Sequence, residues 1–233
     1  MLKVLFENEE LIALEKPSGL DSVSQKQNNK PSAVSYATDV CKFLKNMPEP
    51  EFGLLNRLDR GTSGILVFAK TKTAYDKYKK LWKTKAITKS YRAICSLNQS
   101  LKNEPKSLDR LKVPQKISLI LGNDAKTKTR MRIVRNDHDL KKIRGKPITT
   151  ITHLLYVKKL KNNLWDITCA IETGARHQIR CTLFEYGYPI VGDTRYQGTP
   201  SERLWLHAHR ILIEQDTGSM EIVSALPADW PKS

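Results

Sequence analysis

The stretch NRLDRGTSG at residues 56–64 holds a single carboxylate, Asp59, between two arginines, Arg57 and Arg60. An apolar run over residues 65–69 follows the turn Gly-Thr-Ser-Gly, so the acid lies at the entrance of a predicted buried strand. Nearby positive charges favour the ionised form of a carboxylate. The pattern therefore has two interpretations: a salt bridge that holds a turn, or a carboxylate kept charged for chemistry.

Metal ligation is the other chemistry that the side chains suggest. His177, His207 and His209 suggest a metal site, and His207 and His209 lie two residues apart on a predicted strand, but no third ligand has suitable spacing. The four cysteines form no C-x-x-C pair and have apolar or strand-like neighbours, which predicts reduced, buried thiols. We find no G-x-G-x-x-G loop, Walker loop or H-E-x-x-H pair. The sequence therefore predicts no metal site.

The elements that must position these residues are short. Apolar and β-branched runs predict strands over residues 2–6, 11–15, 64–71, 89–97, 148–160, 164–173 and 204–214. Apolar side chains at helical spacing predict helices over residues 33–46, 74–84 and 175–187. Strands predominate, which indicates an α+β domain built on a largely antiparallel sheet.

Charge indicates the kind of partner. Forty Lys and Arg residues against 24 Asp and Glu give a formal net charge of +16, which is typical of proteins that bind a polyanion such as nucleic acid. Residues 110–146 are especially basic, and the alternation within 126–135 predicts a strand or hairpin arm with one cationic face. A solvated surface hairpin is the alternative. Because a block of like charges repels itself without a counter-charge, we favour an arm that contacts RNA, through Arg130 and Arg132.

Three spaced stretches together resemble the RluA branch of the pseudouridine synthases. Residues 57–64 match R-L-D-x-x-T-S-G, residues 89–91 match K-x-Y, and residues 173–180 match T-G-x-x-H-Q-I-R. Weaker matches support the resemblance at residues 15–19 (E-K-P-S-G, like N-K-P-x-G), 187–193 (G-x-P-I-x-G-D) and 206–208 (L-H-A). The pieces occur in the family's order from about residue 4 to about residue 230, and together they are specific.

The resemblance implies the pseudouridine synthase fold, an α+β architecture in which helices and loops flank a mixed, largely antiparallel sheet crossed by a catalytic cleft. One catalytic domain is expected over residues 1–233, with the basic arm at about 110–146 and no S4-type RNA-binding domain before it. The implied reaction isomerises specific uridines of rRNA or tRNA. The bond from N1 to C1′ is cut, the uracil turns, and C5 is joined to C1′. No atom is gained or lost, so no cofactor is expected.

The same resemblance assigns roles to particular residues. Asp59 is the catalytic carboxylate, which either attacks C1′ or removes a sugar proton. Arg180 pairs with Asp59, and Tyr91 offers an aromatic face to the uracil and a phenol near C5. Arg57 enters the RNA when the target base is flipped out of its stack. Lys89 has two interpretations, a phosphate contact or a fold-supporting ion pair.

The sequence departs from the family pattern at two places. Asn56 stands before Arg57, where the family usually has His, and Ala175-Arg176 stands where Arg-Thr is common. Neither departure replaces the catalytic acid. Both concern the finer positioning of the RNA.

Two functions of other classes compete with the enzyme. A non-catalytic RNA-binding protein would have no need for an acid beside the RNA, and a glycosidase for small nucleosides would leave the charge of +16 unexplained. The sequence shows no signal peptide and no stretch of 18 apolar residues. We therefore expect a cytoplasmic monomer whose partner is RNA, with no membrane and no obligatory protein partner.

Overall fold

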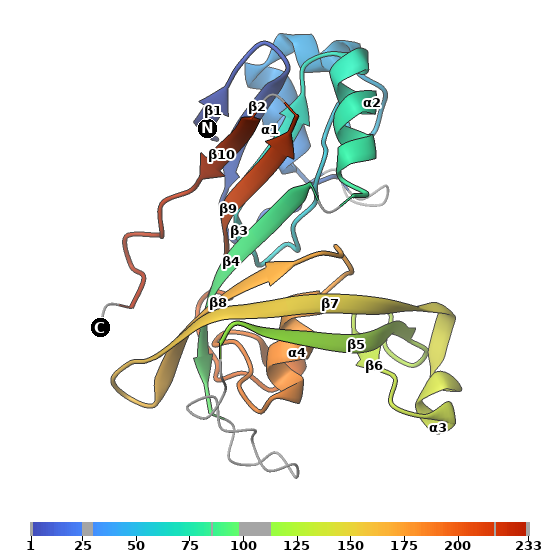
Figure 1. The fold of residues 1–233 in the computed structure, drawn as a ribbon, viewed down its shortest axis with the longest axis vertical. Coiled ribbons are helices and arrows are strands. Elements are labelled where there is room, and N and C mark those ends of the chain that lie inside the picture. The colour runs from blue at the N-terminus through green and yellow to red at the C-terminus, as the bar shows by residue number, and fades with distance from the viewer. Residues whose placement is uncertain (1, 25–29, 85, 98–112, 217, 232–233) are drawn as a thin grey trace. The chain divides into compact units, whose positions relative to one another are not determined.

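The computed structural model describes residues 2–24, 30–84, 86–97, 113–216 and 218–231. The chain divides into two compact units (Figure 1): unit 1 is Met1–Lys89 with His207–Ala228, and unit 2 is Ser90–Leu206 with Asp229–Ser233. Among the residues described, no helix is long and apolar enough to cross a membrane. A single catalytic domain over the whole chain stays a prediction.

Unit 1 is built on a mixed sheet. Its strands follow the order β1-β2-β3-β9, with β10 paired to β9. The neighbours are antiparallel except β3 and β9, which run parallel. The strands are β1 (Lys3–Glu7), β2 (Leu11–Lys16), β3 (Ser63–Ala69), β9 (Leu206–Gln215) and β10 (Gly218–Val223). The helices are α1 (Ala33–Val40), the 3-10 helix η1 (Lys42–Asn46) and α2 (Lys72–Leu81).

Strand β3 is buried along all seven residues, as its continuous apolar sequence predicts. Its parallel pairing with β9 aligns Gly64 with Ala208. Gly64 has φ +113°, and a Cβ added there would lie 2.2 Å from the carbonyl oxygen of Ala208. Only glycine allows this backbone conformation and this close approach together.

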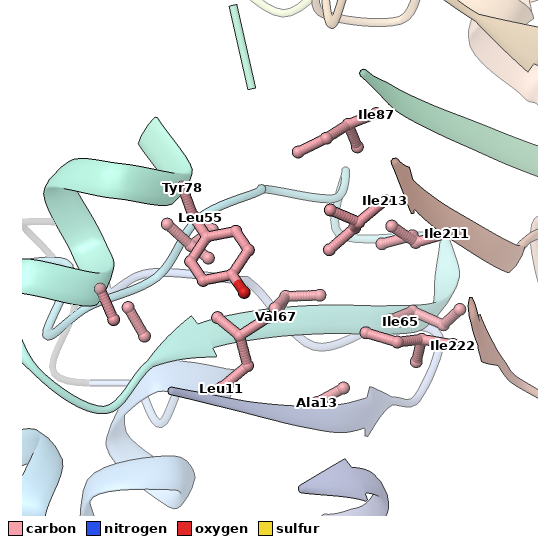
Figure 2. Packing of buried hydrophobic residues seen from close by; sticks show 12 residues of the cluster. Leu11, Ala13, Leu55, Ile65, Val67, Tyr78, Ile87, Ile211, Ile213 and Ile222 are labelled. Atoms are coloured by element: carbon pink, nitrogen blue, oxygen red, sulfur yellow. The ribbon is translucent and has the colours of Figure 1, made fainter. Parts of the chain in front are cut away.

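The apolar core of unit 1 lies between its sheet and α2 (Figure 2). Strands β2, β3, β9 and β10 supply aliphatic side chains, and α2 adds Ala74 and Tyr78 on its buried face. Tyr78 is fully buried, and its hydroxyl donates to Glu10 Oε2 at 2.8 Å. The helical spacing of the apolar residues in α2 therefore predicts the face that packs on the sheet.

Unit 2 is built on an antiparallel ladder in the order β8-β7-β5-β6. These strands are β5 (Gln115–Asp124), β6 (Met131–Ile133), β7 (Ile143–Lys159) and β8 (Leu164–Ile171). The chain enters the unit along β4 (Ile87–Ser96), and its remaining elements are α3 (Asp137–Leu140), α4 (Gln178–Glu185) and the 3-10 helix η3 (Thr194–Tyr196). Helix α4 packs against β5, β6 and β7. Leu121, Met131, Ile133, Cys181 and Tyr196 form the small core beneath it.

The α+β class and the mixed, mostly antiparallel pairing are confirmed, and all seven predicted strands are present. The continuous helix predicted over residues 33–46 is wrong. Cys41 leaves helical geometry, and the tighter η1 turn that follows still buries Leu44, so the apolar spacing is satisfied across a break. Strand β10 was not predicted, because it is short and only its last two residues, Ile222 and Val223, form an apolar run.

Candidate active site

Asp59 lies in unit 1 on the loop that leads into β3. Its side chain is partly exposed, while the flanking Arg57 and Arg60 are exposed. The backbone N–H of Thr62 donates to the carbonyl oxygen of Asp59 at 3.0 Å and closes the turn. The predicted turn ahead of a buried strand is therefore confirmed.

A second segment of unit 1 fixes the backbone around this acid. Ser22 Oγ donates to the carbonyl oxygen of Leu58 at 2.8 Å and accepts from the backbone N–H of Leu58 at 3.0 Å. On the other side of Asp59, the N–H of Gly19 donates to the carbonyl oxygen of Arg60 at 2.8 Å, and Arg60 Nε donates back to the Gly19 carbonyl at 2.9 Å. The backbone of Leu58 and Arg60, the two residues that flank Asp59, is thus held in place.

A fully buried lysine joins the same two segments. Lys16 Nζ donates to three backbone carbonyl oxygens at 2.7–3.1 Å, one of which belongs to Arg60. Burial lowers the pKa of Lys16 to about 8, and the attraction of Asp21 and Asp59 opposes that effect. Unit 1 therefore places a positive charge of its own near Asp59. The K-P-x-G match marked this lysine in the sequence, but its role was not predicted.

Asn56, the unusual residue ahead of the R-L-D stretch, binds the backbone of β3 at two points. Its Nδ2 donates to the carbonyl oxygen of Ile65 at 3.0 Å, and its Oδ1 accepts from the N–H of Val67 at 2.8 Å. The amide supplies one donor and one acceptor to neighbouring groups of the strand, as an adjacent strand would. Asn56 thereby fixes the start of the loop that carries Asp59.

Unit 2 contributes Arg180, from α4, in a buried ion pair with Asp193. Arg180 Nε and Nη2 donate to the two carboxylate oxygens at 2.6 and 2.8 Å, and the side chains are 8% and 1% exposed. The ring of Tyr196 lies 5.2 Å from the guanidinium carbon. This partner of Arg180 was missed, although Asp193 ends the G-x-P-I-x-G-D match. The pairing of Arg180 with Asp59 of unit 1 stays a prediction.

His177 lies at the N-terminus of α4 with a left-handed backbone (φ 54°). Its Nδ1 lies 2.9 Å from the hydroxyl of Tyr196, which also contacts the backbone of Met131. Burial, together with the nearby charges of Arg180 and Arg176, lowers the pKa of His177 to about 3. The ring is therefore neutral across the physiological range and serves the packing of unit 2.

The two histidines of β9 also have protein partners. His207 Nδ1 lies 2.9 Å from Ser63 Oγ, and His209 Nδ1 lies 2.8 Å from the carbonyl oxygen of Ser224. In the part of the chain that the structure describes, no group of three His, Cys, Asp or Glu side chains could hold a metal ion. All four cysteines are free and buried, as predicted.

Gln178 fixes the loop before α4 to the sheet of unit 2. Its Oε1 accepts from Thr173 Oγ1 at 2.7 Å, while its Nε2 donates to the Ile151 carbonyl oxygen at 2.8 Å and to Thr152 Oγ1 at 3.0 Å. The T-G-x-x-H-Q-I-R stretch is thus anchored on β7, and Arg180 projects from an anchored helix.

Two further candidates lie on β4. Tyr91 and Lys89 are 8% and 6% exposed. Burial lowers the pKa of Lys89. Both side chains are therefore largely enclosed by the surrounding protein.

Arg130 and Arg132 of the basic arm have different partners. Arg132 forms a short-range ion pair with the buried Asp124, at 2.7 Å. The guanidinium of Arg130 instead lies over the rings of Phe184 and Tyr196, 5.8 and 5.2 Å from their centres. The first three residues of the predicted arm, 110–112, lie outside the described residues.

Known proteins resemble this chain over most of its length. A family model described as RNA pseudouridylate synthase matches residues 10–184. Ribosomal large subunit pseudouridine synthase C of Rickettsia typhi is 29% identical over 224 residues, which cover 94% of this chain and 65% of that protein. An uncharacterized RNA pseudouridine synthase of Helicobacter pylori is 30% identical, over 90% of this chain and 70% of that protein.

Solved structures agree on the fold. The structure of human RNA pseudouridylate synthase domain containing 1 matches with a TM-score of 0.71 and 19% identity, over 97% of this chain and 83% of that one. At that identity the likeness shows the fold alone. The chain spans 65% of the length of the Rickettsia relative.

Proposed function

The chain belongs to the RNA pseudouridylate synthase family, as an RluA-type member, and from this premise we propose that it isomerises specific uridines of RNA to pseudouridine. The observation that carries the proposal is Asp59 on its anchored loop. Lys16, Asn56 and Ser22 all fix the backbone around this one carboxylate. A protein that only bound RNA would gain nothing from a negative charge held so firmly near a polyanion.

The proposed chemistry needs one ionised acid at the ribose. Asp59 either forms a bond to C1′ as N1 leaves, or removes a sugar proton so that a glycal forms. In either route the uracil leaves with the electron pair of the N1–C1′ bond, turns, and is recaptured through C5. As C5 joins C1′, the bond to Asp59 breaks in the first route, and the sugar carbon regains its proton in the second. C5 then releases its proton to water, and N1 gains a proton. The product has the same atoms as the substrate, which agrees with the absence of cofactor motifs in the sequence.

The other site residues have proposed roles around this step. Arg180 stabilises the charge of Asp59, and Tyr91 lies against the uracil with its phenol near C5. Arg57, exposed beside the acid, enters the RNA as the target base is flipped, which costs a few kcal/mol. Lys89 contacts a phosphate or supports the fold, and Arg130 and Arg132 contact RNA from the arm.

Ribosomal RNA is the proposed substrate, and transfer RNA is the other outcome to be tested. The named relatives from Rickettsia typhi and Nitrosomonas europaea carry large-subunit ribosomal names, which supports rRNA. We further propose that the chain acts in the cytoplasm as a monomer, in one catalytic domain. The net charge of +16 supports direct binding of RNA.

The test uses unmodified rRNA and tRNA transcripts that carry tritium at uracil C5. Wild-type protein should release tritium from at least one transcript, and carbodiimide blocks should map the modified position by primer extension. Asp59→Asn should abolish release and still bind RNA. No release from any rRNA or tRNA would contradict the proposed function.

The matched control is Asp76→Asn, which removes an exposed acid of α2 in the same unit. It should keep the wild-type rate of release. An active Asp59→Asn protein would show that another group is the catalytic acid, even if the reaction itself is correct.

A further inference from the structure

Residues 126–130, Lys-Thr-Lys-Thr-Arg, form a turn between β5 and β6 that we name the cationic turn. Asp124 Oδ1 accepts from the backbone N–H groups of Lys126 and Thr127 at 2.9 and 2.7 Å. The N–H of Arg130 donates to the carbonyl oxygen of Thr127 at 3.1 Å. The N–H of Asp124 donates to the carbonyl oxygen of Arg130, also at 3.1 Å. The turn is therefore ordered by its own hydrogen bonds.

Three residues from the segments around Arg180 fasten the same turn from outside. Arg176 Nη1 donates to the carbonyl oxygen of Lys128 at 3.1 Å, and Arg195 Nη1 donates to that of Thr129 at 3.1 Å. The hydroxyl of Tyr196 accepts from the N–H of Met131, the residue that follows the turn, at 2.9 Å. The arginine of the Ala175-Arg176 departure thus has a structural partner, and the turn is tied to the residues on both sides of the Arg180–Asp193 pair.

Five cationic side chains gather here: Lys126, Lys128, Arg130, Arg176 and Arg195. Across the described ranges of the chain, none of the five forms an ion pair, whereas the adjacent Arg132 and Arg135 do. The nearby carboxylate, Asp124, is buried and already accepts from Arg132 and the turn. Positive charge on this turn is therefore not neutralised by the protein.

Holding like charges together is unfavourable unless a ligand supplies the counter-charge. Unit 2 holds 23 of the 40 Lys and Arg residues but only 11 of the 24 Asp and Glu residues. Its net positive charge adds to the repulsion between the cations of the turn. A turn held by hydrogen bonds also loses little conformational entropy when an anion binds. Guanidinium groups suit phosphate oxygens because they present several N–H donors in one plane.

We infer that the cationic turn, with Arg176 and Arg195, binds successive phosphates of the RNA strand next to the target uridine. The inference rests on the proposed function for the identity of the RNA. Arg176 lies four residues before Arg180, and Arg195 lies two residues after Asp193. The phosphates bound here therefore belong to nucleotides close to the target uridine, at whose isomerisation Arg180 is proposed to act.

The test removes charge from the turn without removing the groups that hold it. Lys126→Ala/Lys128→Ala deletes two exposed ammonium groups, whereas the backbone bonds and Arg176 and Arg195 remain. The probe is unmodified large-subunit rRNA made by transcription in vitro, bound over a series of KCl concentrations. The slope of log affinity against log salt is negative, and its magnitude should fall by about 1.4, at about 0.7 per phosphate contact on a single strand.

The control is Lys158→Ala/Lys161→Ala, which deletes two exposed lysines of unit 2 away from the cationic turn in sequence. Its slope should change by less than half as much. An unchanged slope in Lys126→Ala/Lys128→Ala, or an equal change in the control, would overturn the inference. Binding is measured without catalysis, so these results stand whether or not tritium is released.

A second pair of variants separates the role of Arg195 in fastening the turn from the role of its charge in binding RNA. Arg195→Ala should speed amide hydrogen exchange in residues 126–131 and weaken RNA binding, because it removes a fastening bond and a charge together. Arg195→Lys keeps the charge and should recover most of the affinity. If Arg195→Ala leaves both the exchange and the affinity of the wild type unchanged, the fastening role is wrong.

Discussion

Arg180 and Asp193 form a buried, two-point ion pair within unit 2, with both carboxylate oxygens bound to the guanidinium. The carboxylate belongs to the G-D end of one motif and the arginine to the H-Q-I-R end of another. The pair fixes the direction of the Arg180 side chain before any substrate binds. It is the relationship on which the position of the proposed catalytic arginine depends.

Asp193→Asn should therefore destabilise the protein and reduce its activity. Removing one partner leaves the other charge buried and unpaired, which costs about 3–5 kcal/mol in the free energy of unfolding. Urea unfolding and single-turnover tritium release measure the two effects. The control is Asp229→Asn, since Asp229 is 60% exposed and 3.6 Å from Arg203. A pair whose carboxylate is this exposed contributes less than about 1 kcal/mol. Equal losses in the two variants would contradict the assigned role.

Asn56→Ala should loosen the loop that carries Asp59. The substitution removes two hydrogen bonds to β3 and leaves a backbone donor and an acceptor unsatisfied, at a cost of about 1–3 kcal/mol. Hydrogen exchange at the Val67 amide should become faster, and the rate of tritium release should fall. Asn46→Ala, at an exposed position in unit 1, provides the comparison and should change neither quantity. Slow exchange at Val67 in Asn56→Ala would argue against the contact.

His177 should make stability depend on pH. Its folded pKa of about 3 lies below its ordinary value of 6.5, so the unfolded chain binds the extra proton between these values. The contribution to stability is complete above pH 6.5 and is lost as the pH falls toward 3. At about pH 5 it should amount to a loss of about 2 kcal/mol.

Urea unfolding of wild type and His177→Asn at neutral pH and at about pH 5 measures this effect. Asparagine tolerates the left-handed backbone at this position. The variant is less stable at neutral pH, but it should lose less on acidification. His138→Asn, on the exposed α3, should keep the wild-type pH dependence. Parallel pH curves for His177→Asn and wild type would disprove the prediction.

Gly64→Ala should prevent stable folding of unit 1. The added Cβ would overlap the carbonyl oxygen of Ala208, where β3 and β9 pair. Gly218→Ala tests the backbone conformation without the overlap, because Gly218 also has positive φ but nothing lies within 4 Å of its added Cβ. We expect a loss of about 1–3 kcal/mol for that strain alone. Circular dichroism and urea unfolding compare the two, and a soluble, stable Gly64→Ala protein would show that the strands can separate.

Sequence alone located the turn of Asp59 because a polar, small-residue stretch ahead of an apolar run is a local pattern. It also predicted seven strands, since each of these has its own β-branched or apolar signature, but it did not predict β10. It did not give the contacts of Asn56, Lys16 and Asp193. Those contacts join backbone and side chains that are distant in the chain, and no local periodicity encodes them.

The basic arm shows the same limit of prediction from sequence. Its charge predicted a basic surface, but not that Arg132 would be paired with a buried acid while Lys126 and Lys128 would stay exposed. Ion pairing depends on which strands become neighbours, and that is decided by the whole sheet. Charge density therefore predicted the kind of partner and left open which residues meet it.

The burial of Lys16 has a practical consequence for chemical labelling. An amine-reactive reagent should modify the exposed lysines of the folded protein and spare Lys16 and Lys89, which are 0% and 6% exposed. Both lysines become accessible only when the surrounding segments open. Mass spectrometry of these two amines would thus report the integrity of the native fold in a mixture, without a purified substrate or an added probe.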